Sequence, residues 1–237
     1  MLARRCFMNF HRSPDVTPHS PDHPALPLWI KLAYTGFLLV LVPVYSWHYG
    51  PTNFLYFCDI ALLLTGVAVW KESRLLASMA AVGILIPQLF WCLDFLGQFL
   101  RSAAGSPHTG MTAYMFDGDR PLYLRALSLF HGWLPFLLLF LLARLGYDPR
   151  ALPLWSAASV AICVVSYTLL PPAGAVLDDP NLPRNINYVF GLSDDAPQAY
   201  MPSECYLVCW MAVLCLFAFL PTHLALRKLF GNLTPEI

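Results

Sequence analysis

Six long apolar runs divide the chain, and polar, turn-forming residues separate them. About 20 residues of helix cross the ~30 Å hydrocarbon core of a bilayer. The runs are of roughly that length or longer and cover positions 29–47, 52–70, 75–100, 121–145, 151–170 and 203–220. The pattern therefore predicts an all-α polytopic membrane protein, a bundle of six transmembrane helices.

The connections between the runs are of two kinds. KESR at 71–74 and GYDPR at 146–150 are short turns, whereas 101–120 and 172–202 are long loops. An apolar stretch at 188–190 inside the second long loop leaves room for a further short helix in the 172–202 segment. Pro87 lies within the third run and predicts a kink there.

Composition agrees with a membrane protein. The chain is 58% hydrophobic and 12% charged, against about 25% charged residues in soluble domains. The formal net charge is zero, which gives no indication of a nucleic-acid partner; the expected partners are the lipid bilayer and a lipid substrate. We expect a single transmembrane domain at 28–230, with flexible cytoplasmic tails at 1–27 and 231–237.

The distribution of Lys and Arg predicts the orientation, because cytoplasmic loops of membrane proteins are enriched in these residues. With six helices and a cytoplasmic N-terminus, ten basic residues fall inside and four fall outside. The outer four are Arg101, Arg120, Arg125 and Arg184. We therefore expect both termini in the cytoplasm of a bacterium, with the chain in its inner membrane and both long loops facing outward.

Polar residues within the apolar runs collect on the outer side of the predicted bundle. By depth along their helices, Asp59 and Asp94 are expected at similar levels, about 10 Å in from the outer surface. A charge in a membrane helix costs at least about 2.5–3.5 kcal/mol unless it is paired, protonated or hydrated. The seven polar groups of this leaflet are Asp59, Asp94, Gln88, Arg125, His131, Tyr167 and Glu204. Asp59, Asp94 and His131 are the catalytic candidates, and Gln88, Arg125 and Tyr167, with Asn187 of the second long loop, are the substrate-binding candidates.

Three kinds of chemistry fit this set. Two aspartates and a histidine can bind a divalent metal that activates water. A histidine beside a carboxylate can act as a general base. Acidic groups in the membrane can instead carry protons or hold a transported cation. No tight spacing motif selects among these, so the sequence gives no prediction for a metal, a cofactor or the oligomeric state.

A structural interpretation stands beside each functional one. Asp59 or Asp94 can pair with Arg125 and hold helices together. His131 can bond to a neighbouring hydroxyl or carbonyl group, and Glu204 can be a first-turn carboxylate at a helix dipole. Seven polar groups in one leaflet are more than packing of the bundle requires, which favours function.

Several long motifs resemble known families. YGPTNFLYFCDIALL, TAYMFDGDRPLYLRALSLFHGWLP, NINYVFG and LPTHLALRKLF together resemble an uncharacterised family of bacterial polytopic membrane-associated proteins. The similarity covers about 45–230 and implies the topology without an activity. FLYFC and NINYVF also resemble, more weakly, segments of YwaF-type integral membrane proteins and a related cysteine-dependent phospholipid acyltransferase. That resemblance implies a nucleophile at Cys58, although Tyr56 replaces the family's histidine two residues before the cysteine.

These observations lead to one main functional hypothesis. The chain is expected to be an outer-leaflet membrane enzyme that acts on a lipid or lipid-linked group through Asp59, Asp94 and His131, with Arg125 holding an anionic headgroup. A proton- or cation-coupled transporter and a helper subunit without chemistry are the alternatives.

Overall fold

The computed structural model describes residues 26–105 and 110–231, and the regular elements within these ranges are all helices. The terminal tails predicted at 1–27 and 231–237 fall almost wholly outside the described residues. The helices in chain order are α1 (Leu28–Tyr49), η1 (Pro51–Leu55), α2 (Phe57–Lys71), α3 (Arg74–Ala103), η2 (Ala113–Phe116), α4 (Leu122–Ser128), α5 (Phe130–Leu145), α6 (Ala151–Leu169), η3 (Ile186–Tyr188), α7 (Ser203–Val213), η4 (Leu214–Phe219) and α8 (Leu220–Phe230).

Five helical segments of the described chain are long and apolar enough to span a membrane, and the protein is a multi-pass membrane protein. They are α1, α3, the α4–α5 segment, α6, and the continuous segment from α7 to α8. The sixth predicted span corresponds to α2, which has only 15 residues. At about 1.5 Å per residue α2 is roughly 22 Å long, shorter than the hydrocarbon core.

The predicted start of the second helix at position 52 is wrong. Pro51 opens the 3₁₀ helix η1, and Tyr56 then adopts an extended conformation (φ −62°, ψ 139°), so α2 begins only at Phe57. Asp59 therefore lies in the first turn of α2.

Two further predicted helices also differ in detail. The fourth run is divided at Leu129 into α4 and α5. The last run continues beyond its predicted end at 220 to Phe230, with the π-helical segment η4 just before Pro221. Proline removes a helical hydrogen bond and clashes with the preceding turn, which accounts for the π segment at this point.

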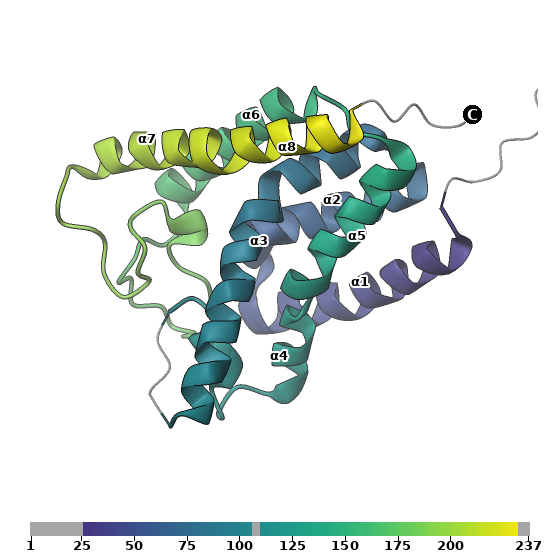
Figure 1. Ribbon diagram of the computed structural model, residues 1–237. Helices are drawn as coiled ribbons and strands as arrows, with labels where there is room; N and C mark the ends of the chain where they lie inside the picture. Colours follow the sequence, from purple (N-terminus) through teal and green to yellow (C-terminus); the bar gives the residue numbers. More distant parts are fainter. Residues whose placement is uncertain (1–25, 106–109, 232–237) are drawn as a thin grey trace, which may run out of the picture.

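Helix α3 occupies the centre of the bundle and packs against α2, α5, α6 and α8 (Figure 1). Helix α3 approaches α6 closely at Gly83, where an added Cβ atom would lie 2.1 Å from the Trp155 ring. Trp155 is almost completely buried and packs edge-to-face against Phe57 and Phe219. The small residue in α3 therefore makes room for a large aromatic side chain that ties three helices together.

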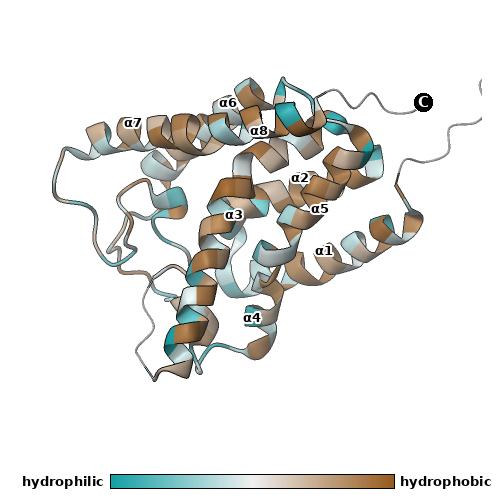
Figure 2. Ribbon diagram, viewed as in Figure 1, coloured by the Kyte–Doolittle hydropathy of each residue, from teal (hydrophilic) through white to brown (hydrophobic). Residues whose placement is uncertain are grey.

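Large apolar side chains also cover the outer surface of the bundle. Phe136 is 74% exposed and Phe217 is 70% exposed. Figure 2 shows hydrophobic residues along the outward faces of α1, α3, α5 and α7. An apolar exterior of this kind fits a lipid environment. The start of α1 and the end of α8 lie at the same side of the molecule (Figure 1).

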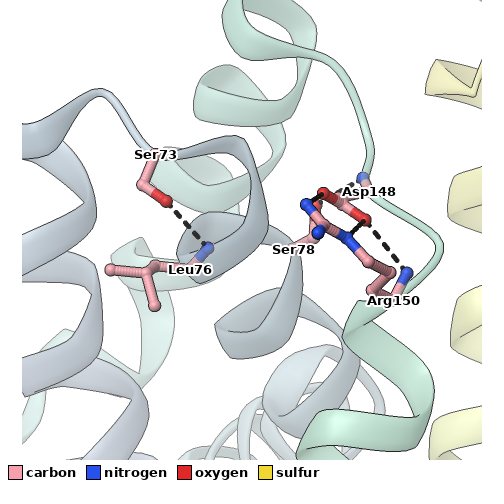
Figure 3. A network of polar contacts seen from close by, with 5 residues as sticks. All are labelled: Ser73, Leu76, Ser78, Asp148 and Arg150. Atoms are coloured by element: carbon pink, nitrogen blue, oxygen red, sulfur yellow. Dashed lines mark hydrogen bonds and ion pairs between the residues drawn. The ribbon is translucent and has the colours of Figure 1, made fainter.

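A polar network fixes the turn between α5 and α6 against the start of α3 (Figure 3). The Asp148 backbone N–H donates to Ser78 Oγ at 2.9 Å, and the Asp148 carboxylate accepts from the Arg150 backbone and guanidinium. Ser73 caps α3 by accepting from the Leu76 N–H at 3.3 Å. The hydrogen bond from Arg150 lowers the pKa of Asp148.

Candidate functional site around Asp59

Asp59 is the most deeply buried carboxyl group among the predicted catalytic residues, with 3% of its surface exposed. Its Oδ2 accepts from Asn53 Nδ2 at 3.1 Å, and the Cys58 thiol lies 4.0 Å from the same oxygen. Its Oδ1 is buried and has no hydrogen-bond partner in the structure. Leaving a buried polar group unpaired costs about 1–3 kcal/mol, and more for a charged group. An unpaired carboxyl oxygen in the protein interior therefore needs a functional or ligand-binding explanation.

Asp59 and Asp94 are not level in the bundle. A tight turn between Lys71 and Arg74 joins α2 to α3. Counting the same number of residues from this turn along each helix places Asp59 opposite Ile86. Asp94 lies eight residues beyond Ile86, which is about 12 Å along the axis of α3. The equal depths predicted from the sequence were counted from the far ends of the runs 52–70 and 75–100, which differ in length, and not from this shared turn.

Asp94 holds the loop that follows α3. Its Oδ2 accepts from the Thr112 backbone N–H at 2.8 Å and from the Thr112 hydroxyl at 2.7 Å. Gln98 Nε2 donates to Oδ1 at 3.3 Å. A Cβ atom at Gly110 would lie 2.7 Å from Oδ1, so glycine is required where the loop passes the carboxylate.

His131 lies in an aromatic environment at the start of α5. Its ring stacks on Trp91 at 4.8 Å, and its Nδ1 lies 2.8 Å from the Ser128 carbonyl oxygen. The Ser128 hydroxyl forms a 2.9 Å hydrogen bond with the Tyr45 hydroxyl. Pro135 cannot donate to the His131 carbonyl, and the Cys92 thiol donates to that oxygen instead, at 3.8 Å.

The three predicted catalytic residues thus belong to three separate hydrogen-bonded groups. Within the part of the chain that the structure describes, no hydrogen bond or ion pair joins Asp59, Asp94 and His131 directly, and neither aspartate pairs with Arg125. The shared three-residue site therefore stays a prediction. The Tyr45 hydroxyl, which bonds to the Ser128 hydroxyl of the His131 group, is within electrostatic range of the Asp59 carboxyl group.

The segment Asn185–Tyr188 holds the start of α2 from the second long loop. Asn187 Oδ1 accepts from the Phe57 N–H at 3.0 Å, and Asn187 Nδ2 donates to the Leu55 carbonyl at 2.9 Å. Asn185, Asn187 and Tyr188 all have positive φ angles, of 51°, 59° and 61°. Such a conformation is tolerated by asparagine but is a true outlier for a bulky residue such as tyrosine. Backbone strain of this kind is frequent at functional sites.

Tyr188 is a candidate site residue that sequence reasoning missed. Its hydroxyl lies within electrostatic range of Cys58 in α2 and Asp94 in α3, and also of Asp194 and Tyr114. Burial raises the pKa of Tyr188, and burial likewise raises the pKa of Tyr114 to about 12. Both hydroxyl groups therefore keep their protons at neutral pH and can donate hydrogen bonds. The motif NINY was the only sequence signal for this position.

The predicted substrate-binding residues divide between two places. Gln88 is 2% exposed and leaves both side-chain amide atoms unpartnered; it lies two residues from the level of Asp59, about 3 Å along α3. Arg125 donates to the Met115 carbonyl at 3.3 Å, and its Nε is buried without a partner. Tyr167 instead pairs with Glu204 at 3.3 Å in an exposed position. Asn187 serves the backbone of α2, as described above.

The site holds no preformed metal centre in the described part of the chain, where no group of three or more His, Cys, Asp or Glu residues is placed to hold an ion. The site does contain a buried acid, proton-donating tyrosine hydroxyls and a thiol beside the acid. Comparison with family models, curated proteins and solved structures gave no match. We therefore infer the function from the geometry of these residues.

Proposed function

We propose that this protein is a membrane enzyme that acts on a lipid or lipid-linked group in the outer leaflet, with Asp59 as its acid–base group. The observation that carries the proposal is the buried Asp59 carboxyl group with one unpartnered oxygen. A carboxyl group shielded from water can exchange a proton with a bound hydroxyl group or water near neutral pH. Asn53 supports the opposite oxygen at 3.1 Å and leaves Oδ1 for the reacting group.

Tyrosine hydroxyl groups supply the second part of the mechanism. Tyr188 and Tyr114 keep their protons and donate toward negative charge that develops on a reacting ester or phosphate oxygen. The strained NINY segment holds Tyr188 while Asn187 fixes the first turn of α2, so the acid and the donor are positioned by the same loop. In this proposal Asp94 and His131 act indirectly. Asp94 holds the loop that follows α3, and His131 acts through the Tyr45–Ser128 contact.

A transporter is the second candidate, and Gln88 favours it. The unpartnered amide of Gln88 lies near the level of Asp59 within the bundle, where the two groups can line a path for protons or a small cation. This alternative needs the same aspartate but no lipid product. A helper subunit, the third hypothesis, needs neither.

One reconstitution distinguishes these functions. Purified protein is placed in nanodiscs that contain total bacterial lipid, and lipids are followed by mass spectrometry over time. The enzyme proposal predicts loss of one lipid class with the matching product. In parallel, proteoliposomes with a pH gradient report flux. Flux without lipid conversion would support the transporter, and neither signal would support the helper subunit.

Cys58 provides a test of the acyltransferase resemblance. Its thiol lies 4.0 Å from Asp59 Oδ2 and has partly buried, largely apolar surroundings. Buried cysteine commonly acts as a small packing residue. We therefore expect Cys58→Ser to keep most of the lipid conversion. Complete loss with unchanged folding would instead assign a covalent acyl intermediate to Cys58.

A further inference from the structure

A second polar feature lies at the outer end of α1, separate from Asp59. It is a cavity of about 360 Å³ between the end of α1, the end of the first long loop, the start of α4 and Asn181 of the second long loop. Its lining carries both signs of charge. The polar lining residues are His48, Tyr49, Asp117, Asp119, Arg120 and Asn181.

Arg120 provides the positive charge of this cavity. Its guanidinium carbon lies 5.9 Å from the centre of the Tyr49 ring and 5.4 Å from that of the Tyr114 ring, and one N–H donates to the Tyr49 hydroxyl at 3.1 Å. Among the residues that the structure describes, no carboxylate lies within ion-pair distance of Arg120. The guanidinium is thus held in place by rings, and its other N–H groups stay available for an anion such as a phosphate.

Asp119 and Asp117 provide the negative charge. Asp117 Oδ1 accepts from the Asp119 backbone N–H at 3.0 Å, which forms the turn. Both side chains are exposed, and neither forms an ion pair within the described ranges. A cation and two carboxylates that share a cavity without pairing match a ligand that is itself both anionic and cationic.

The surroundings of the cavity place it at the level of lipid headgroups. Trp47 is 85% exposed, Leu122 is 72% exposed and Tyr123 is 50% exposed beside it. Trp and Tyr side chains are enriched at membrane–water interfaces, where one part of the ring is apolar and another is hydrated. The Tyr123 hydroxyl also pairs with His48 Nε2 at 2.7 Å, which links this aromatic rim to the cavity lining.

We propose that this cavity binds the headgroup of a zwitterionic phospholipid, with its phosphate on Arg120 and its ammonium group at Asp119 and Asp117. The cavity connects to the acid–base site through aromatic contact, because Tyr49 packs edge-to-face on Tyr45 at 5.2 Å. The bound lipid is thereby the substrate class of the enzyme, a step that rests on the proposed function. The binding itself does not depend on catalysis.

The test measures lipid affinity by native mass spectrometry of the full chain in detergent. The probes are dihexanoyl phosphatidylethanolamine, dihexanoyl phosphatidylglycerol and free phosphoethanolamine. Wild-type protein is expected to prefer the ethanolamine lipid over both others. Loss of a charge-assisted hydrogen bond in Arg120→Gln should weaken that binding about tenfold or more. Asp119→Asn should weaken it by about two- to fivefold and bring the two lipids to similar affinity.

Arg74→Gln is the matched control, because it removes an exposed arginine at the start of α3 that does not line the cavity. The lipid affinity of this variant should equal that of the wild type. Equal affinity of the two lipids for the wild type, or unchanged binding by Arg120→Gln, would overturn the headgroup site. If free phosphoethanolamine binds as tightly as the ethanolamine lipid, the assignment of the ligand as a lipid is overturned. Asp59→Asn should bind the ethanolamine lipid normally. If the wild type binds this lipid but does not convert it, the result contradicts the proposed function and leaves the headgroup site in place.

Discussion

The contact between Asn187 and the start of α2 gives the sharpest stability prediction. Replacing Asn187 with alanine removes two hydrogen bonds, to the Phe57 N–H and the Leu55 carbonyl, at 3.0 and 2.9 Å. Each such bond contributes about 0.5–1.5 kcal/mol, and alanine at φ 59° adds about 1–2 kcal/mol of backbone strain. The expected loss is about 2–5 kcal/mol in the free energy of unfolding. Asn187→Gly keeps the conformational freedom and should lose only about 1–3 kcal/mol.

The assay compares the free energies of unfolding of these variants in bicelles. Asn181, an exposed residue of the same loop, supplies the control, and Asn181→Ala should change stability by less than about 0.5 kcal/mol. Both Asn187 variants should also lower lipid conversion, because the first turn of α2 loses its support. Equal losses for the glycine and alanine variants would refute the strain argument. A neutral alanine variant would refute the contact itself.

Two further predictions concern packing and pH. Gly83→Ala should destabilise the bundle by about 1–3 kcal/mol because its Cβ meets the Trp155 ring. Gly97→Ala in the same helix meets no atom within 4 Å and should be neutral or stabilising. Equal effects of the two substitutions on stability would contradict the packing of Gly83 against Trp155. Arg150 lowers the pKa of Asp148 from its usual 3.8, so as pH falls this carboxyl group is protonated in the unfolded chain before it is protonated in the folded protein. The resulting stabilisation should be complete above pH 3.8 and disappear as pH falls through the native pKa, and Asp148→Asn should flatten this acid dependence in thermal unfolding.

The helical class and most helix positions could be predicted from the sequence, because long apolar runs leave few alternatives in a membrane. The start of α2 could not. Its position depends on the Asn187 side chain, which lies 130 residues further along the chain than Phe57. Hydrophobic patterning carries no information on such a contact, so the run at 52–70 appeared to be one continuous helix.

The candidate site was predictable only in part. A polar side chain in an apolar run stands out by composition, which is why the Asp59 carboxyl group and the Gln88 amide were identified. Tyr45, Tyr114 and Tyr188 did not stand out, because tyrosine is common in membrane helices and at interfaces. Their proximity to the Asp59 region results from tertiary packing of α1, η2 and η3, which local sequence does not encode.

The most direct test of the central claim is the rate of lipid conversion by Asp59→Asn in nanodiscs. The change keeps the size of the side chain and removes its proton-exchanging group. General acid–base catalysis contributes about 10²- to 10⁴-fold, so conversion should fall at least about 100-fold. Glu204→Gln, which alters an exposed carboxylate that accepts from Tyr167, should keep the wild-type rate. A folded Asp59→Asn variant that converts lipid at the wild-type rate would contradict the assignment of Asp59 as the acid–base group.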